Sequence, residues 1–160
     1  MILVLLGTQN NNFHRLLDEI ENNINEGNIK DEVIVQAGFT KYTSKKMKVF
    51  NMMPQEELNE LVQKADLIIT HAGVGSIEMA LQNNKKVITV PRLKKYGEHV
   101  NNHQIEIEQE FNKRGWVIGI DDVSDLGTAL NKSKKFVPVK YENSKDKKLV
   151  NIIKTYIDKL

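Results

Sequence analysis

The sequence feature that most constrains the fold is a repeated alternation of short, continuous apolar runs with longer amphipathic stretches. The apolar run at residues 2–6 is followed by a stretch over 13–24 whose apolar residues recur every three or four positions, as on one face of a helix. Runs that are apolar at every position are typical of strands covered on both faces. Strands joined by helices of about ten residues indicate parallel βαβ units. The pattern therefore predicts an α/β fold with a single Rossmann-like, doubly wound parallel sheet.

The same pattern predicts the order of elements along the chain. Further strands are predicted over residues 32–36, 48–50, 66–70, 87–90 and 116–120. Helices are predicted over residues 13–24, from Pro54 onward, and over 76–82, 100–113 and 122–130. Pro54 followed by Glu56 and Glu57 is typical of a helix N-terminus, because proline fits the first turn and acidic side chains complement the helix dipole.

Length and composition exclude several classes of protein. A chain of 160 residues with 40% hydrophobic and 28% charged residues is expected to form one compact domain. The absence of cysteine excludes disulfide scaffolds, thiolate metal sites and cysteine nucleophiles, and it suits a reducing compartment. No apolar run approaches the ~20 residues of a membrane-spanning helix, and no basic segment precedes the first run. We therefore expect a cytoplasmic protein.

Charge changes after residue 130. Residues 1–130 carry 14 Lys and Arg against 18 Asp and Glu, whereas residues 131–160 carry 9 Lys against 3 acidic residues. This basic end suits either a solvated lysine-rich face or an anionic partner such as nucleic acid or lipid. We expect residues 1–130 to form the folded domain and the polar residues 131–147 to form a connector.

Residues 148–160 have an amphipathic pattern of their own. Its apolar positions are spaced by three and four: Leu149, Ile152, Ile153, Tyr156, Ile157 and Leu160. The pattern predicts a C-terminal amphipathic helix. This helix either packs back on the domain, docks on a partner or lies at a membrane surface.

Two glycine-containing loops follow predicted strands, at the sheet edge where open parallel sheets bind ligands. The first begins at Gly7, and the second runs from His71 to Ser76 with the sequence H-A-G-V-G-S. Glycines let backbone N–H groups approach an anion, and Ser76 near a predicted N-cap makes the second loop a candidate phosphate cradle. Glu78 follows in the predicted first helical turn, where a carboxylate either complements the dipole or accepts hydrogen bonds from a diol. His71 is either a packed or capping residue or a catalytic one.

Two further segments are expected at the same edge. Arg92 ends a strand, where it either meets a phosphate or lies on the surface. Residues 98–104 (E-H-V-N-N-H-Q) concentrate amide and imidazole side chains, which suit neutral, hydroxyl-rich ligands. His99 and His103 are four positions apart, yet neither a third ligand nor an H-E-x-x-H motif accompanies them, so we expect no metal site.

Taken together, these segments resemble one protein family. The motifs are G-T-Q followed by F-x-R-L-L, then V-I-V-Q-A-G, A-D-L-I-I-T-H-A-G-V-G-S-I-E, V-P-R and H-x-x-N-H-Q, within about residues 1–120. In this order they are similar to the C-terminal, sugar-nucleotide-binding half of GT-B glycosyltransferases of family 28. The similarity is greatest to the short stand-alone subunits of capsule and exopolysaccharide transferases and of the eukaryotic N-glycan UDP-N-acetylglucosamine transferase.

The resemblance implies a UDP-sugar donor site and assigns roles to the residues at matching positions. Gly7 and Thr8 would lie by the phosphates, Met52 and Met53 beside the uracil ring, and Glu78 would accept both ribose hydroxyls. The diphosphate would be held by the backbone N–H groups of Gly73, Val74, Gly75 and Ser76. The sugar hydroxyls would be contacted by His103 and Gln104, with His99 and Asn102 as neighbours.

The resemblance also implies the donor-binding subunit of a two-component, UDP-sugar-dependent glycosyltransferase. The acceptor half and the catalytic base would come from a membrane-anchored, acceptor-binding partner at the inner face of the cell membrane. A hexosyl group, with galactosyl as the first choice, would pass to a lipid-linked sugar in capsule or exopolysaccharide synthesis. No metal or other cofactor is expected, since the helix N-terminus at residues 75–76 would stabilise the leaving diphosphate.

Two other functions are compatible with the sequence. The first is a non-catalytic accessory subunit that stabilises or activates a membrane-bound transferase. The second is an unrelated nucleotide-binding regulatory domain. Nucleic acid is not expected as a partner, because the basic end carries aromatic residues but no recognised nucleic-acid-binding fold.

Overall fold

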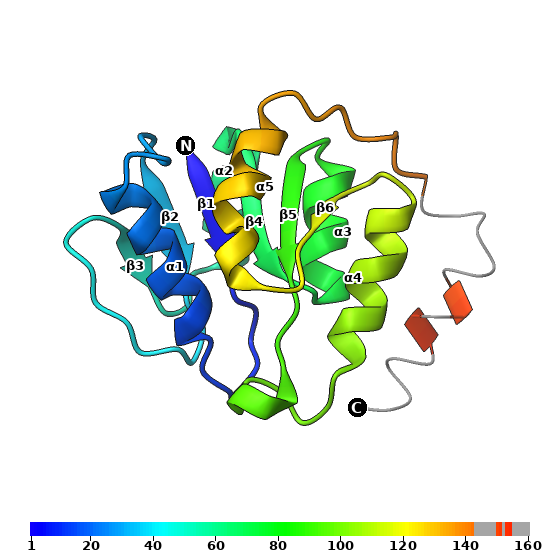
Figure 1. The fold of residues 1–160 in the computed structure, drawn as a ribbon, viewed down its shortest axis with the longest axis horizontal. Coiled ribbons are helices and arrows are strands. Elements are labelled where there is room, and N and C mark those ends of the chain that lie inside the picture. The colour runs from blue at the N-terminus through cyan, green and yellow to red at the C-terminus, as the bar shows by residue number, and fades with distance from the viewer. Residues whose placement is uncertain (143–149, 152, 155–160) are drawn as a thin grey trace.

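A computed structural model describes residues 1–142, 150–151 and 153–154 and has one sheet at its centre (Figure 1). The strands within these residues are β1 (Ile2–Leu5), β2 (Val33–Gln36), β3 (Lys48–Phe50), β4 (Leu67–His71), β5 (Lys86–Val90) and β6 (Ile118–Gly119). They pair in the order β3-β2-β1-β4-β5-β6, and every pair is parallel. The prediction of a single Rossmann-like parallel sheet is confirmed.

Helices cover both faces of this sheet. The α-helices of the described residues are α1 (His14–Asn25), α2 (Gln55–Lys64), α3 (Val74–Gln82), α4 (His103–Lys113) and α5 (Leu126–Ser133). Helices α1 and α5 lie on one face, and α2, α3 and α4 lie on the other (Figure 1). In β1, Ile2 and Val4 pack toward the first pair, whereas Leu3 and Leu5 pack toward the other three. Because both faces are buried, the strand is apolar at every position.

The order of the sheet reverses between β1 and β4. The chain leaving β1 continues to β2 on one side, and the chain leaving β4 continues to β5 on the other. The loops after these two strands therefore diverge and leave a crevice at the carboxyl edge of the sheet. The buried Thr70 hydroxyl ties the two strands together at this edge, because it donates a hydrogen bond to Leu5 O at 2.8 Å.

Several predicted boundaries differ from the structure by a few residues. Helix α3 begins at Val74 and not at residue 76. Helix α4 begins at His103 and not at residue 100, because the residues before it form a turn in which Asn102 Oδ1 accepts a hydrogen bond from Lys94 N–H. The helix predicted over 122–130 is divided into a 3₁₀ turn at Val123–Asp125 and α5.

The chain after α5 passes beside α3 and α4 (Figure 1). Residues 131–133 of the predicted connector belong to α5, and residues 143–147 lie outside the described residues. Of the helix predicted over 148–160, residues 150, 151, 153 and 154 are helical, and the others lie outside the described residues. Ile153 packs against the apolar cluster that α2, α3 and α4 form with the sheet.

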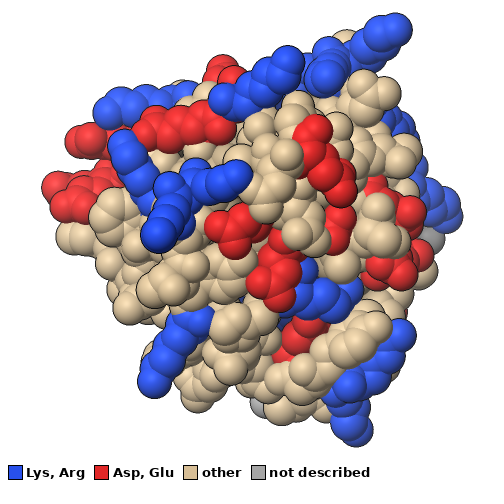
Figure 2. All heavy atoms as spheres, turned by 60° about the vertical axis from the view of Figure 1, so that its left-hand side comes forward, with Lys and Arg blue, Asp and Glu red and all other residues tan. Residues whose placement is uncertain are grey.

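Charges of both signs are intermingled on the face shown in Figure 2. Ion pairs of the described residues include Lys48 with Glu32 at 2.5 Å and the chain's N-terminal amine with Asp66 at 2.5 Å. Such exposed pairs contribute little to stability, because water screens the attraction between the charges. No helix in the described part of the chain has the length and apolarity to cross a bilayer.

Phe13→Ala should lower the free energy of unfolding by about 3–5 kcal/mol, because it empties a site that is 0% exposed. Phe39→Ala is the matched control, because Phe39 is 54% exposed and its loss should change stability by less than about 0.5 kcal/mol. Urea unfolding followed by circular dichroism measures both changes. Equal losses in the two variants would contradict this description of the core.

Candidate functional site

An open cleft of about 820 Å³ lies over the carboxyl ends of β1 and β4, where the sheet order reverses. Nine of the thirteen residues to which the resemblance assigned a place in the donor site line it: Gly7, Thr8, Met52, Met53, Gly73, Val74, Gly75, Ser76 and Glu78. They come from the loops after β1, β3 and β4 and from α3, so the fold gathers segments that are far apart in the chain. Four other predicted residues do not line the cleft: His99, Asn102, His103 and Gln104.

The N-terminus of α3 opens on the cleft with free helical donors. Gly73 is the N-cap, and the first helical hydrogen bond runs from Ile77 N–H to Gly73 O. The backbone N–H groups of residues 74–76 therefore have no partner within the helix. A Cβ on Gly75 would meet no atom within 4 Å, so the space beside this turn is open. Ser76 lies in the first turn of α3 rather than at the N-cap. Because free backbone N–H groups and the positive end of the helix dipole meet here, this end of the cleft suits a phosphate.

The His71 ring lies between the two glycine loops. A Cβ on Gly7 would stand 2.5 Å from His71 Nε2, and a Cβ on Gly73 would stand 2.1 Å from His71 Cε1. Both positions therefore require glycine, and Gly7 also has a φ of 71°, which disfavours other residues. Burial, with the Arg92 charge second, lowers the pKa of His71 to about 3. His71 is therefore a neutral imidazole at physiological pH.

A chain of hydrogen bonds assigns the position of the His71 proton. Arg92 N–H donates to Gln104 Oε1 at 2.9 Å, which leaves Gln104 Nε2 to face His71 Nδ1 at 3.1 Å. The amide nitrogen is a donor only, so His71 Nδ1 is the acceptor. The imidazole proton is then on Nε2, the atom that lies nearest Gly7. The cleft thus has a neutral N–H donor at its floor, beside the free N–H groups of α3.

Arg92 has a role that neither alternative from the sequence described. It is 1% exposed, and its guanidinium donates to Leu6 O at 2.6 Å, to Asn11 O at 2.8 Å and to Glu98 O at 3.2 Å. Phe13 packs against the same group, with 5.1 Å from the guanidinium carbon to the ring centroid. Both a phosphate-binding and a surface-exposed Arg92 are therefore wrong. The side chain instead holds the loop after β1 against the loop after β5.

Arg15 and Glu98 form an ion pair that also connects distant segments and that was not predicted from the sequence. The carboxylate of Glu98 is bound at both oxygens, by Arg15 Nε at 2.8 Å and by Arg15 Nη2 at 2.9 Å. Glu98 is 3% exposed, and it also accepts a hydrogen bond from Leu93 N–H. The arginine of the F-x-R-L-L motif was the available signal. The pair fixes α1 to the loop that follows β5.

The histidine and amide side chains of residues 98–104 do not line the cleft. His99 is buried, and its Nδ1 accepts a hydrogen bond from Asn101 N–H at 3.3 Å. On the exposed side of α4, His103 Nδ1 lies 3.9 Å from Glu106 Oε1. Gln104 is fully buried, and both ends of its amide are engaged as described above. Their contacts with a sugar stay predictions. Among the described residues no group of three potential ligands is arranged to hold a metal ion.

The opposite end of the cleft is formed by the loop after β3. Met52 and Met53 line it, and Met52 is 56% exposed. Gln36 Nε2 donates to Gly7 O at 3.1 Å and to Asn51 O at 3.3 Å, and so joins this loop to the loop after β1. Gln36 also lines the cleft. It stands in the V-I-V-Q-A-G motif, which was the signal available for it.

Glu78 lies on the side of the cleft toward the C-terminal segment. Because α3 begins at Val74, Glu78 is its fifth residue, and the prediction that it lies in the first turn is wrong. Its Oε1 accepts a hydrogen bond from Tyr141 Oη at 2.7 Å. The carboxylate therefore stands at the cleft with its orientation held by a neighbouring phenol.

A parallel sheet with a glycine-lined cleft at its reversal point is typical of nucleotide-binding α/β domains. The chain matches the glycosyltransferase family 28 C-terminal domain over residues 1–156, and it belongs to this family. It is 39% identical over 61 residues to the human UDP-N-acetylglucosamine transferase subunit ALG13 and 41% identical over 61 residues to ALG13 of Candida albicans. These matches cover 38% of this chain but only 5% and 20% of the two relatives.

Solved structures share the fold over nearly the whole chain. The glycotransferase of kitacinnamycin has a TM-score of 0.63 at 16% identity, over 96% of this chain and 37% of that one. The UDP-GlcNAc 2-epimerase of Methanocaldococcus jannaschii, solved with UDP-GlcNAc and UDP, has a TM-score of 0.61 at 22% identity, over 97% and 44%. At these identities the similarity establishes the fold alone.

Arg92→Met should lower the free energy of unfolding by about 3 kcal/mol or more, since it leaves three backbone carbonyls without their donor. The loss should be present without any nucleotide. Lys94→Met is the control, because Lys94 has an exposed side chain on the following turn. Thermal and urea unfolding measure both variants. An Arg92→Met protein as stable as the wild type would contradict the structural role.

The lowered pKa of His71 predicts a pH dependence of stability. Between pH 6.5 and 3 the unfolded chain binds a proton at His71 that the folded protein does not, so stability falls as the pH falls. From pH 7 to pH 5 this one group should cost about 2 kcal/mol. Urea unfolding at both pH values measures it in the wild type and in His71→Asn, which cannot titrate. The wild type should lose more stability than the variant, and equal losses would show that His71 is not a buried neutral base.

Proposed function

We propose that this chain is the donor-binding subunit of a UDP-sugar-dependent glycosyltransferase that acts together with an acceptor-binding, membrane-anchored partner subunit. The observation that carries the proposal is the cleft at the reversal point of the sheet. Its floor combines the free N–H groups of α3 with the neutral Nε2–H of His71, and a carboxylate stands on its wall. Donors at the floor fit a diphosphate, and the carboxylate fits a ribose diol.

The shape of the cleft supports this orientation of the donor. The diphosphate would lie against residues 73–76 and the loop that begins at Gly7. The ribose would bind Glu78, and the uracil would lie beside Met52 and Met53. A cleft of about 820 Å³ is in the size range of sites for ligands of this kind.

The transfer would be a displacement at the anomeric carbon of the sugar. The acceptor oxygen would form the new bond as the bond to the diphosphate breaks, and the electron pair would leave with UDP. A base on the partner would take the acceptor proton. The N–H donors of α3 and His71 would stabilise the charge that develops on the diphosphate, an effect worth about 10²–10³ in rate for one such donor.

The sugar is a hexose in this proposal. The relatives named ALG13 are subunits of UDP-N-acetylglucosamine transferases, which favours N-acetylglucosamine. The resemblance to capsule and exopolysaccharide subunits favours galactose, passed to a lipid-linked sugar at the inner face of the membrane. A direct comparison of the affinities for UDP-N-acetylglucosamine and UDP-galactose distinguishes these two sugars.

The need for a partner is supported by the surface around the cleft. The structural neighbours are more than twice as long as the part of them that this chain covers. Large apolar side chains are exposed on the loops at the carboxyl edge: Phe39 at 54%, Met52 at 56%, Tyr96 at 54% and Val100 at 68%. A partner covering this edge would bury them. The alternative is a non-catalytic accessory subunit, which would use the same edge without binding donor.

A thermal-shift titration tests the proposal. UDP, UDP-galactose, UDP-N-acetylglucosamine and UDP-glucose are compared with ADP, on the chain alone and on the chain co-expressed with its partner. A ligand at 100 times its dissociation constant should stabilise the protein by about 2.7 kcal/mol. Shifts with uridine ligands and none with ADP support donor binding, and their ranking identifies the sugar. No shift in either preparation would favour the accessory subunit.

Glu78→Ala should weaken UDP binding by about tenfold or more, because it removes a charged acceptor from the ribose hydroxyls. Glu106→Ala is the control, because Glu106 is an exposed carboxylate outside the cleft. Isothermal titration calorimetry measures both affinities, and thermal unfolding verifies that both variants fold. Unchanged affinity in Glu78→Ala would remove Glu78 from the site.

A further inference from the structure

The segment after α5 is fixed to the body of the domain close to the cleft. Val139 N–H donates to Gly115 O at 3.0 Å, at the turn between α4 and β6. The Tyr141 ring packs edge-on against Trp116, with ring centroids 4.9 Å apart and planes at 87°. Trp116 is itself buried against Phe111 in the same way, at 5.5 Å. The position of the Tyr141 phenol is therefore set by the core.

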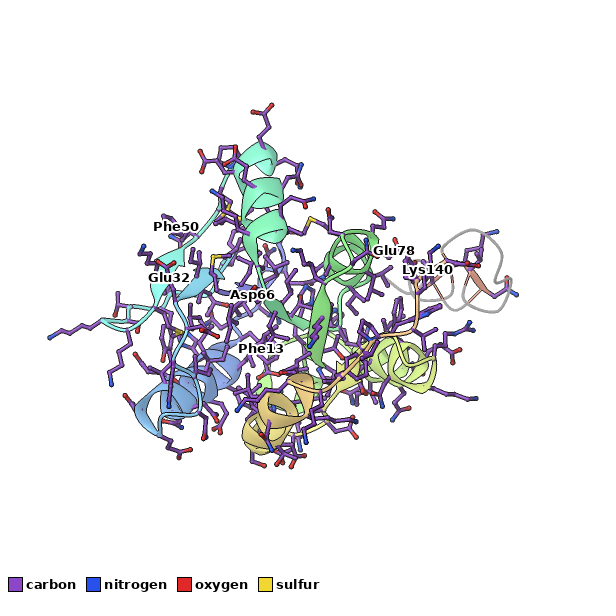
Figure 3. The ribbon with its side chains drawn as sticks, turned by 90° about the horizontal axis from the view of Figure 1, so that it is seen from above. Phe13, Glu32, Phe50, Asp66, Glu78 and Lys140 are labelled. Atoms are coloured by element: carbon purple, nitrogen blue, oxygen red, sulfur yellow. The ribbon has the colours of Figure 1, made fainter. Side chains whose placement is uncertain are left out.

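This phenol reaches Glu78 on the wall of the cleft. Tyr141 Oη donates to Glu78 Oε1 at 2.7 Å, across 63 positions of sequence. Figure 3 labels Glu78 on α3 and Lys140, the residue before Tyr141, and the two lie next to one another in that view. This placement agrees with the hydrogen bond between Tyr141 and Glu78. Burial and the charge of Glu78 raise the pKa of Tyr141, so the phenol stays protonated and remains a donor. A hydroxyl bound to a carboxylate is among the stronger hydrogen bonds in proteins.

The bond leaves acceptor capacity on Glu78 for a ligand. A carboxylate has two oxygens with about four acceptor sites, and Tyr141 occupies one of them. Glu78 would otherwise have a flexible side chain, which loses rotamer freedom when it binds a ligand. Because the phenol holds the carboxylate in one orientation beforehand, less of that freedom is lost on binding.

We propose that Tyr141 is a positioning residue for Glu78, and that the segment after α5 is thereby part of the ribose site. This inference rests on the proposed function, in which Glu78 binds the ribose hydroxyls. Ile153 supports it independently, because it lines the same cleft from beyond residue 142. Displacement of the segment would therefore weaken the binding of ribonucleotides in particular.

Tyr141→Phe tests the role, because it removes the hydroxyl and keeps the ring on Trp116. Calorimetry gives the affinities for UDP and for 2′-deoxyuridine diphosphate, which lacks one of the hydroxyls that Glu78 would bind. UDP affinity should fall by about three- to tenfold, and the deoxy ligand should lose less. The preference for UDP over the deoxy ligand should therefore decrease. A loss through general loosening of the fold would weaken both ligands equally.

Two further variants complete the test. Tyr42→Phe is the matched control, because Tyr42 also donates to a carboxylate, Glu21 at 2.8 Å, but does not line the cleft. It should leave both affinities unchanged. In a Glu78→Gln background, Tyr141→Phe should have a smaller effect than in the wild type, because the charged acceptor that it orients is gone.

The outcomes separate the inference from the proposed function. Equal weakening of both ligands, or tighter UDP binding in Tyr141→Phe, would overturn the positioning role. If the wild type prefers UDP through Glu78 and Tyr141→Phe keeps that preference, the inference alone is wrong. If the wild type binds neither nucleotide, alone or with its partner, the proposed function and the inference are both wrong.

Discussion

The site depends on one buried guanidinium. Arg92 binds the carbonyls of Leu6, Asn11 and Glu98 and so fixes the loop after β1 against the loop after β5. Its backbone N–H also fixes the orientation of the Gln104 amide, and this amide in turn places the His71 imidazole proton on Nε2. A positive charge without solvent is costly unless its donors are engaged, so this arrangement allows few alternative conformations. The loops at the cleft are therefore held in place before any ligand arrives.

The cleft is built from backbone groups and neutral donors rather than from exposed cations. Helix α3 contributes its free N–H groups, and His71 contributes Nε2–H because burial keeps the ring uncharged. Such donors can stabilise a diphosphate as it leaves, because they are already oriented when charge develops. The Glu78 carboxylate, which accepts a hydrogen bond from Tyr141, adds a polar group to the wall of the same cleft. This arrangement is what the proposed donor-binding role requires, and the chain belongs to the glycosyltransferase family 28 C-terminal domain family.

The sequence predicted those parts that depend on local pattern. Apolar runs and helical spacing were sufficient for the parallel sheet. The glycine loops indicated the phosphate side of the cleft, whereas Met52 and Met53 were placed only through the family resemblance. Contacts between distant segments could not be predicted. The burial of Arg92 requires carbonyls from residues 6, 11 and 98, and Tyr141 lies 63 positions from Glu78. Gln104 was expected at a sugar, but its place is set by the strand end at residue 92 and by His71.

The most direct test of the account is an NMR titration of the ¹⁵N-labelled chain with UDP, because it locates the ligand as well as detecting it. The amide signals of Gly7, of residues 73–76 and of Met52 and Met53 should shift together, with a single dissociation constant. Signals from the far edge of α5 should stay in place, and ADP should have little effect. Shifts confined to other surfaces, or an equal response to ADP, would contradict a uridine nucleotide site in this cleft.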